Sequence, residues 1–319
     1  IYGMEAALET IRGAMERGAK IVVYGDYDVD GVCATTILTQ ALREHGANAA
    51  YRIPSRHSEG YGLNAEAVRE IAAEYELLIT VDCGITSVAE AALARELGLK
   101  LVVTDHHEPP ERLPQADAVV DPLLGAGCGR GLCGAGVALK IVQGLWGLEA
   151  AEQLMELAAL ATVADMVPLT GENRAIVSLG LRRLQKTTRP GLRELMSLSG
   201  LDGKAVNAGH IGFQIAPRLN AGGRLGDSNR CVELLLTDDA ALGARIAREL
   251  DETNAERQRL EAAIVREADR QVAANADFLR DKVLIAVGEG WNRGVVGLAA
   301  GRLTEKYAWP SIVFSREDG

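Results

Sequence analysis

Three aspartates occupy alternate positions directly after an apolar run, in the stretch IVVYGDYDVDG at residues 21–31. Asp26, Asp28 and Asp30 thus put three negative charges within five residues. Carboxylates forced this close together raise one another's pKa unless a cation lies between them. In a locally extended backbone, a period of two turns side chains the same way. We therefore expect Asp28 and Asp30 to face one cation site, although Asp30 could alternatively be the N-cap of the following helix.

Further acidic and histidine side chains end later apolar runs. Asp82 ends the run in TVDCG, the triplet Asp105, His106 and His107 follows VVT, and Asp165 ends a helical run in TVADMVP. One such aspartate alone would more often be a loop residue or a helix cap. The carboxyl ends of parallel strands, however, meet at the sheet edge where ligands bind. We therefore predict that these side chains converge with the first cluster.

This set of donors is typical of a site for hard cations. Carboxylate oxygens with one or two imidazoles suit Mn²⁺ or Mg²⁺ better than zinc. Enough ligands are present for one or two ions, and two ions could share a bridging aspartate. Two ions roughly 3.5–4 Å apart serve in-line displacement at phosphorus, because one activates water and the other offsets charge on the leaving oxygen. The cluster therefore indicates phosphoryl-transfer chemistry.

Apolar runs that alternate with helical patterns must position these residues. Strands are predicted at 20–26, 48–56, 76–84, 99–108 and 117–122, with helices at 31–46, 64–75 and 87–98. This alternation indicates βαβ units and a doubly wound, mainly parallel α/β sheet. The continuous apolar character of the strands favours burial on both faces.

The second half of the chain is predicted to be mainly helical. Helices are expected at 136–147, 150–166 and 174–185, and a glycine-rich loop at 214–227. Residues 238–275 predict one helix roughly 55 Å long, which we interpret as a connector between domains. Strand, turn, helix and strand follow over 281–315. We expect a catalytic domain at 1–236, the connector at 237–278 and an incomplete second α/β domain at 279–319.

Composition places the 319-residue chain among ordinary globular proteins, with 48% apolar and 24% charged residues. No apolar stretch reaches the roughly 18 residues of a membrane span, and no signal peptide is recognisable. Five cysteines without a CxxC pair favour free thiols in a reducing cytoplasm. Cys128 and Cys133 could instead pair or share a metal. The net charge of −10 says little about an anionic partner, because cation-binding carboxylates contribute to it.

Four motifs, DYDVDG, VDCG, TDHHEP and ADMVPL, resemble the successive motifs of the DHH phosphoesterase superfamily. EGYGL, APRLNAGGR and GWNRGVVG narrow the resemblance to RecJ-type single-strand-specific 5′→3′ DNA exonucleases, with a DHHA1-like second domain. The resemblance runs in order over nearly the whole chain. Asn292 stands where the family usually has histidine, and the sequence stops before the family's later glycine-rich motif and OB-fold domain.

The resemblance implies a role for each residue of the cluster. The metal ligands that it implies are Asp28, Asp30, Asp82, His106 and Asp165. Among these, Asp82 would be the bridge between two ions. His107 would lie near the scissile phosphate, and Asp26 would orient ligands or water.

Basic and amide side chains are candidates for substrate binding. These candidates are Arg218, Asn220, Arg224 and Arg56. Arginine pairs bidentately with phosphate, and glycines permit close approach of the backbone. The alternative is a solvated loop whose arginine pairs with a local acid such as Asp227. Trp291 could stack on a base or anchor the second domain.

The implied activity is release of 5′-mononucleotides from single-stranded DNA by two-metal hydrolysis, in DNA repair and recombination. The resemblance leaves open a helicase and a single-strand-binding protein as partners. One alternative is a DHH phosphoesterase acting on short oligonucleotides, adenosine bisphosphate or cyclic dinucleotides. Another is a non-enzymatic binding protein with the same fold, which retention of all the metal ligands disfavours.

Overall fold

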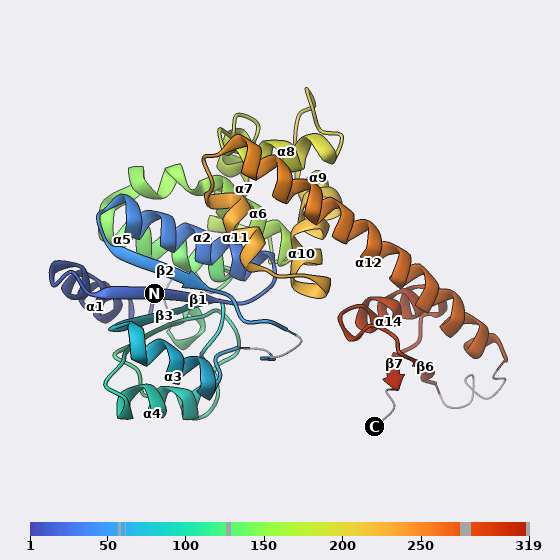
Figure 1. Cartoon of the computed structure of the whole chain (residues 1–319), viewed down its shortest axis with the longest axis horizontal. Coiled ribbons are helices and arrows are strands. Elements are labelled where there is room, and N and C mark those ends of the chain that lie inside the picture. Colours follow the sequence, from blue (N-terminus) through green and yellow to red (C-terminus); the bar gives the residue numbers. More distant parts are fainter. Residues whose placement is uncertain (57–58, 61, 126–128, 275–281, 317–319) are drawn as a thin grey trace.

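The computed structural model describes residues 1–56, 59–60, 62–125, 129–274 and 282–316. Its larger part is an α/β domain, and its smaller part lies at the far end of one long helix (Figure 1). The five strands of the larger part are β1 (Lys20–Gly25), β2 (Asn48–Arg52), β3 (Leu77–Val81), β4 (Lys100–Thr104) and β5 (Ala118–Val120). They lie in the order β2-β1-β3-β4-β5, and every neighbouring pair is parallel. The predicted parallel sheet is confirmed.

Helices cover both faces of this sheet (Figure 1). One face carries α1 (Met4–Glu16), α2 (Val29–Glu44) and α5 (Gly134–Gln153), and the other carries α3 (Ala65–Glu74) and α4 (Val88–Glu96). Side chains alternate along β1 accordingly: Ile21 and Val23 join the first core, whereas Val22 and Tyr24 join the second. The strands therefore read as continuous apolar runs because both faces are buried.

A layer of further helices packs beyond α2 and α5. It contains α6 (Met155–Ala164), α7 (Gly171–Leu184), α8 (Pro190–Leu198), α9 (Ala208–His210), the π-helical turn η2 (Ile211–Ile215) and α11 (Asn229–Leu236). Helices α1, α8 and α11 lie outside the predicted elements. The predicted break before residue 150 is instead a kink at Gly147, where φ is 88° within α5.

The glycine-rich stretch 214–227 is mainly a helix, α10 (Ala216–Leu225), and the predicted loop is wrong. Its glycines mark close helix packing rather than a turn. A Cβ on Gly222 would lie 2.6 Å from the Cys231 Sγ, and one on Gly223 would lie 2.3 Å from the Tyr27 carbonyl oxygen. The spacing of apolar residues in this stretch is therefore that of a helix, and its glycines let α10 pack closely against its neighbours.

The long helix α12 (Ala240–Ala274) confirms the long helix predicted over residues 238–275. Its first half packs on α8, α10 and α11, and its second half on β6 (Leu284–Glu289) and α14 (Arg293–Tyr307). With β7 (Ser311–Arg316), which pairs parallel to β6, these form a βαβ unit. Trp291 packs against the core of this unit, as the anchoring alternative predicts. None of the helices in the described part of the chain is long and apolar enough to cross a membrane.

Candidate active site

The aspartate-rich motif forms the turn from β1 into α2. Asp28 is the N-cap of α2, and its Oδ1 accepts the N–H groups of Asp30 at 2.8 Å and Gly31 at 3.1 Å. Asp30 therefore lies inside the first helical turn, so its predicted alternative role as N-cap is wrong. The period of two does not arise from an extended backbone either. Gly31 is required because a Cβ there would lie 2.3 Å from the Asp26 carbonyl oxygen.

Asp30 reaches across the site to the N-terminus of α5. Its carboxylate oxygens accept the N–H groups of Gly134 at 2.6 Å and Ala135 at 2.7 Å. A helix N-terminus favours negative charge, and the N-cap Cys133 supplies no side-chain cap of its own. A Cβ on Gly134 would lie 2.6 Å from the Asp82 Cβ. Gly134 thus allows α5 to meet both aspartates, which the sequence motifs do not reveal.

Asp82 lies at the centre of the cluster, directly after β3. Its φ of 59° is left-handed, which is a strained conformation for a residue other than glycine and one found often at functional sites. The Oδ1 atom lies 3.0 Å from the His106 Nε2 without the geometry of a hydrogen bond. His106 Nε2 also lies 3.5 Å from Asp30 Oδ2 and 3.9 Å from Asp165 Oδ2. One imidazole nitrogen therefore faces carboxylates from three elements.

The side chains form three adjoining groups whose possible ligand atoms lie within 4.8 Å of one another. The groups are Asp26, Asp28 and Asp82; Asp30, His106 and Asp165; and Asp82, His106 and His107. The structure thus brings together every residue predicted as a metal ligand, with both predicted neighbours. Asp82 belongs to two groups, which is the placement a bridging ligand requires.

Buried carboxylates without partners suit a cation. Within the described part of the chain, no hydrogen-bond partner reaches Oδ1 of Asp26 or of Asp82, although both atoms are buried. Burial, with Asp28 nearby, raises the pKa of Asp26 to about 7. Burial also raises the pKa of Asp30 to about 6 and that of Asp82 well above its usual value. Divalent cations would offset this charge, and the oxygen-rich donors fit Mn²⁺ or Mg²⁺.

His107, a member of the third group, pairs with Asp105, which belongs to none of the three groups. The His107 Nδ1 lies 2.7 Å from the Asp105 Oδ1. This contact raises the pKa of His107 to about 9. Burial alone would raise the pKa of Asp105, but hydrogen bonds from His107 and from backbone N–H groups lower it overall. The ring is therefore a cation near neutral pH, which suits contact with an anion.

Two predicted substrate residues have contacts within the protein. Arg218 Nε donates to Asp251 Oδ1 at 2.8 Å, and its Nη1 donates to the Gln214 carbonyl at 2.7 Å. The acid paired with Arg218 is therefore Asp251 on the distant helix α12, and not a local acid such as Asp227. Asn220 Oδ1 accepts the Val29 N–H at 3.1 Å, which ties α10 to the start of α2.

The other two predicted substrate residues lie on the side of Asp26 and Asp28. Arg224 Nη1 donates to the Gly294 carbonyl at 3.1 Å, at the start of α14 in the smaller part. The Arg56 Cζ lies 5.0 Å from the centroid of the Tyr27 ring. Burial, with Arg56 and Arg257 nearby, lowers the pKa of Arg224. Positive charge thus collects where the two parts of the molecule meet. Asn292 caps α14 by accepting the Gly294 N–H at 2.8 Å.

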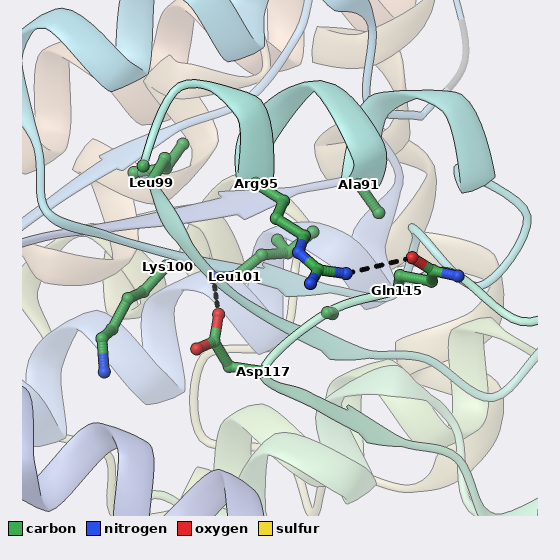
Figure 2. A pocket seen from close by; sticks show the side chains of 9 residues that line it. Ala91, Arg95, Leu99, Lys100, Leu101, Gln115 and Asp117 are labelled. Atoms are coloured by element: carbon green, nitrogen blue, oxygen red, sulfur yellow. Dashed lines mark hydrogen bonds between the residues drawn. The ribbon is translucent and has the colours of Figure 1, made fainter.

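A cavity of about 600 Å³ lies at the opposite edge of the sheet (Figure 2). Arg95 on α4 donates to the Gln115 side chain at 3.2 Å there, and Asp117 accepts the Leu101 N–H at 2.9 Å. None of the clustered acidic or histidine side chains lines it. The clustered acidic and histidine side chains therefore lie at the carboxyl edge of the sheet and not in this cavity.

Comparison with known proteins agrees with the fold and the cluster. Residues 20–164 match the family model for the DHH family, N-terminal domain. The single-stranded-DNA-specific exonuclease RecJ of Bacillus subtilis is 42% identical over 320 residues, which cover 99% of this chain and 40% of the relative. RecJ of Thermus thermophilus is 38% identical over 322 residues, covering 100% of this chain and 47% of the relative. The chain thus spans about half the length of the curated relatives it matches.

Solved structures agree over the whole chain. A crystal structure of exonuclease RecJ bound to manganese matches with a TM-score of 0.90 at 38% identity, over 99% of this chain and 80% of that one. RecJ in complex with Mn²⁺ from Thermus thermophilus matches with a TM-score of 0.88 at 36% identity, over 98% of this chain and 46% of that one. The parallel sheet with its aspartate–histidine cluster at the carboxyl edge is thus a DHH-type domain. The chain belongs to the RecJ family, as its motifs predict.

Proposed function

We propose that this chain is the catalytic core of a metal-dependent exonuclease that degrades single-stranded DNA from the 5′ end and releases mononucleotides. One observation carries the proposal: buried carboxylates and two histidines meet around Asp82 at the carboxyl edge of the sheet, and one oxygen each of Asp26 and Asp82 has no hydrogen-bond partner among the described residues. The names of the relatives supply the substrate class, single-stranded DNA.

Mn²⁺ or Mg²⁺ is the proposed cofactor, as in the RecJ structures solved with these ions. The residues that would hold one or two ions are Asp28, Asp30, Asp82, His106 and Asp165, and Asp26 has an oxygen available beside them. When bound, the ions lower the pKa of a water molecule and offset negative charge on the phosphate. Asp82 would serve both positions. The cationic His107 would stabilise the charge that develops on the phosphate oxygens.

Arg56 and Arg224 are the proposed contacts for the DNA backbone. They lie beside Asp26 and Asp28, and α14 directs its N-terminus to the same region through the contact of Arg224 with Gly294. A helix N-terminus and arginine side chains both bind phosphate. Arg218 and Asn220 enter the proposal only as residues that hold α10, the helix that bears Arg224, in place.

The surroundings of the protein are part of the same proposal. Four described cysteines are buried free thiols, Cys33, Cys83, Cys133 and Cys231. They are compatible with a reducing cytoplasm, while Cys128 lies outside the described residues. A helicase that exposes single strands and a single-strand-binding protein are the proposed partners, because a nuclease of this specificity needs unpaired substrate.

Cleavage of 5′-labelled single-stranded DNA in the presence of Mn²⁺ tests the proposal. We expect labelled mononucleotides, loss of activity with chelator, and no cleavage of blunt duplex. Asp82→Asn should abolish activity, whereas Asp117→Asn, at the opposite sheet edge, should retain it. Activity that survives chelation, or equal cleavage of duplex, would refute the mechanism. Faster turnover of dinucleotides than of long strands would instead favour the small-substrate phosphoesterase.

A further inference from the structure

Asp105 ends β4 and is almost fully buried beside the cluster, with 1% of its surface exposed. Its Oδ1 accepts the backbone N–H groups of His106 at 2.8 Å and His107 at 3.3 Å, and it also contacts the His107 Nδ1 at 2.7 Å. Its Oδ2 accepts the Ile85 N–H at 2.9 Å. Four nitrogen atoms therefore surround this one carboxylate.

These contacts set Asp105 apart from the other acids of the cluster. Three of these nitrogens contact Oδ1 and the fourth contacts Oδ2, so both oxygens of Asp105 have partners within the protein. Asp105 also belongs to none of the candidate ligand groups formed by the described residues. In contrast, Asp26 and Asp82 each keep a buried oxygen that no described group satisfies. The geometry thus separates Asp105 from the acids that could hold an ion.

Packing alone constrains the orientation of the His107 ring only in part. Its side chain keeps 47% of its surface exposed, so the packing around it is incomplete. The neighbouring His106 ring lies at a centroid distance of 4.4 Å and an angle of 50°, which is a tilted contact rather than a close stack. The contact of Nδ1 with Asp105 is short and directional, so it can fix the rotation of the imidazole ring.

We propose that Asp105 is a positioning residue, which holds the His107 imidazole at Nδ1 so that the Nε2 edge of the ring meets the substrate phosphate. The inference rests on the proposed function. Carboxylates that orient a functional histidine in this way are common around metal sites, and their loss costs about 10- to 100-fold in activity or affinity. The same carboxylate accepts the N–H of Ile85, in the turn after Asp82, so Asp105 links the His107 ring to that turn.

A double-mutant cycle with single-stranded DNA as substrate tests the role in catalysis. Asp105→Asn should lower kcat about 10- to 100-fold with little change in KM. In a His107→Ala background the same change should lower kcat by less than about twofold, because two residues that act as one unit are not additive. Asp117→Asn is the matched control, since Asp117 also holds a backbone N–H of β4 but lies at the opposite edge (Figure 2).

Two outcomes would overturn the inference. One is an equal loss of kcat from Asp105→Asn in both backgrounds. The other is a loss of Mn²⁺ affinity, measured by calorimetry, as large as that of Asp82→Asn, because Asp105 would then serve the metal rather than the ring.

Nuclear magnetic resonance tests the inference without any activity. In ¹⁵N-histidine-labelled protein with Mg²⁺, the His107 Nδ1–H should give a slowly exchanging signal that Asp105→Ala removes. The His45 Nδ1, which lies 2.8 Å from the Ala41 carbonyl oxygen, should keep its signal in both proteins. Absence of the His107 signal from the parent protein refutes the inference. If the parent protein has no nuclease activity, the proposed function fails. The nuclear magnetic resonance signal alone then decides whether Asp105 positions the His107 ring.

Discussion

Removal of divalent metal should make the stability of this protein fall as pH rises. Asp26 and Asp30 have pKa values of about 7 and about 6 because they are buried, whereas a carboxyl group in the unfolded chain titrates near 3.9. The folded protein therefore binds extra protons above about pH 4. A carboxyl with a raised pKa stabilises the fold fully below its unfolded pKa, and this stability is lost as pH rises through the folded pKa.

The expected loss follows from these two groups. Each extra proton on the folded state lowers the free energy of unfolding by about 1.4 kcal/mol per pH unit. From about pH 5 to about pH 8, Asp26 and Asp30 together account for a loss of about 4 kcal/mol. This corresponds to roughly 5–10 °C in Tm. His107, with its raised pKa, acts in the same direction.

Calorimetric melting of chelator-treated protein across this pH range provides the assay. Mn²⁺ or Mg²⁺ should raise Tm more at about pH 8 than at about pH 5, because the ions stabilise the ionised carboxylates. Asp26→Asn should raise the metal-free Tm at the higher pH, and the exposed control Asp117→Asn should not. A metal-free Tm that stays level or rises with pH would refute the reasoning.

Two further substitutions test how the site is built. Gly134→Ala places a Cβ 2.6 Å from the Asp82 Cβ, so it should weaken Mn²⁺ binding in calorimetry by at least about tenfold. The control Gly297→Ala, whose Cβ would point into open space, should leave the Mn²⁺ affinity unchanged. Equal affinities of the two variants would argue against the packing role of Gly134. Arg218→Ala should lower the free energy of unfolding in urea by about 1–3 kcal/mol with KM unchanged. Arg224→Ala should instead raise KM for single-stranded DNA, and the opposite pattern would reverse the two roles.

Local patterns in the chain were enough to predict the sheet and the membership of the cluster. Strands buried on both faces must be continuous apolar runs, and their carboxyl ends must meet at one edge. Asp82 and His106 could therefore be assigned to one site from their positions after such runs. The connector helix was equally predictable, because a long helical period without proline leaves few alternatives.

Contacts between distant segments lay beyond that reasoning. The contact of Asp30 with Gly134 joins residues about a hundred positions apart, and no local pattern encodes it. Arg218 was predicted to contact phosphate, yet its partner is Asp251 on α12. The glycines of α10 suggested a loop, because their effect on close packing depends on which helix lies opposite.

Residue types and their positions after apolar runs were enough to predict which side chains could hold a metal and in which order the strands present them. The different roles of those side chains depend on contacts that form only in the folded protein. Among the described residues, one buried oxygen of Asp82 has no hydrogen-bond partner, whereas Asp105 has four nitrogen contacts. The two aspartates follow neighbouring strands and are chemically identical. The physical reason for the difference is that a carboxylate takes its role from the donors around it, and those donors come from distant parts of the chain.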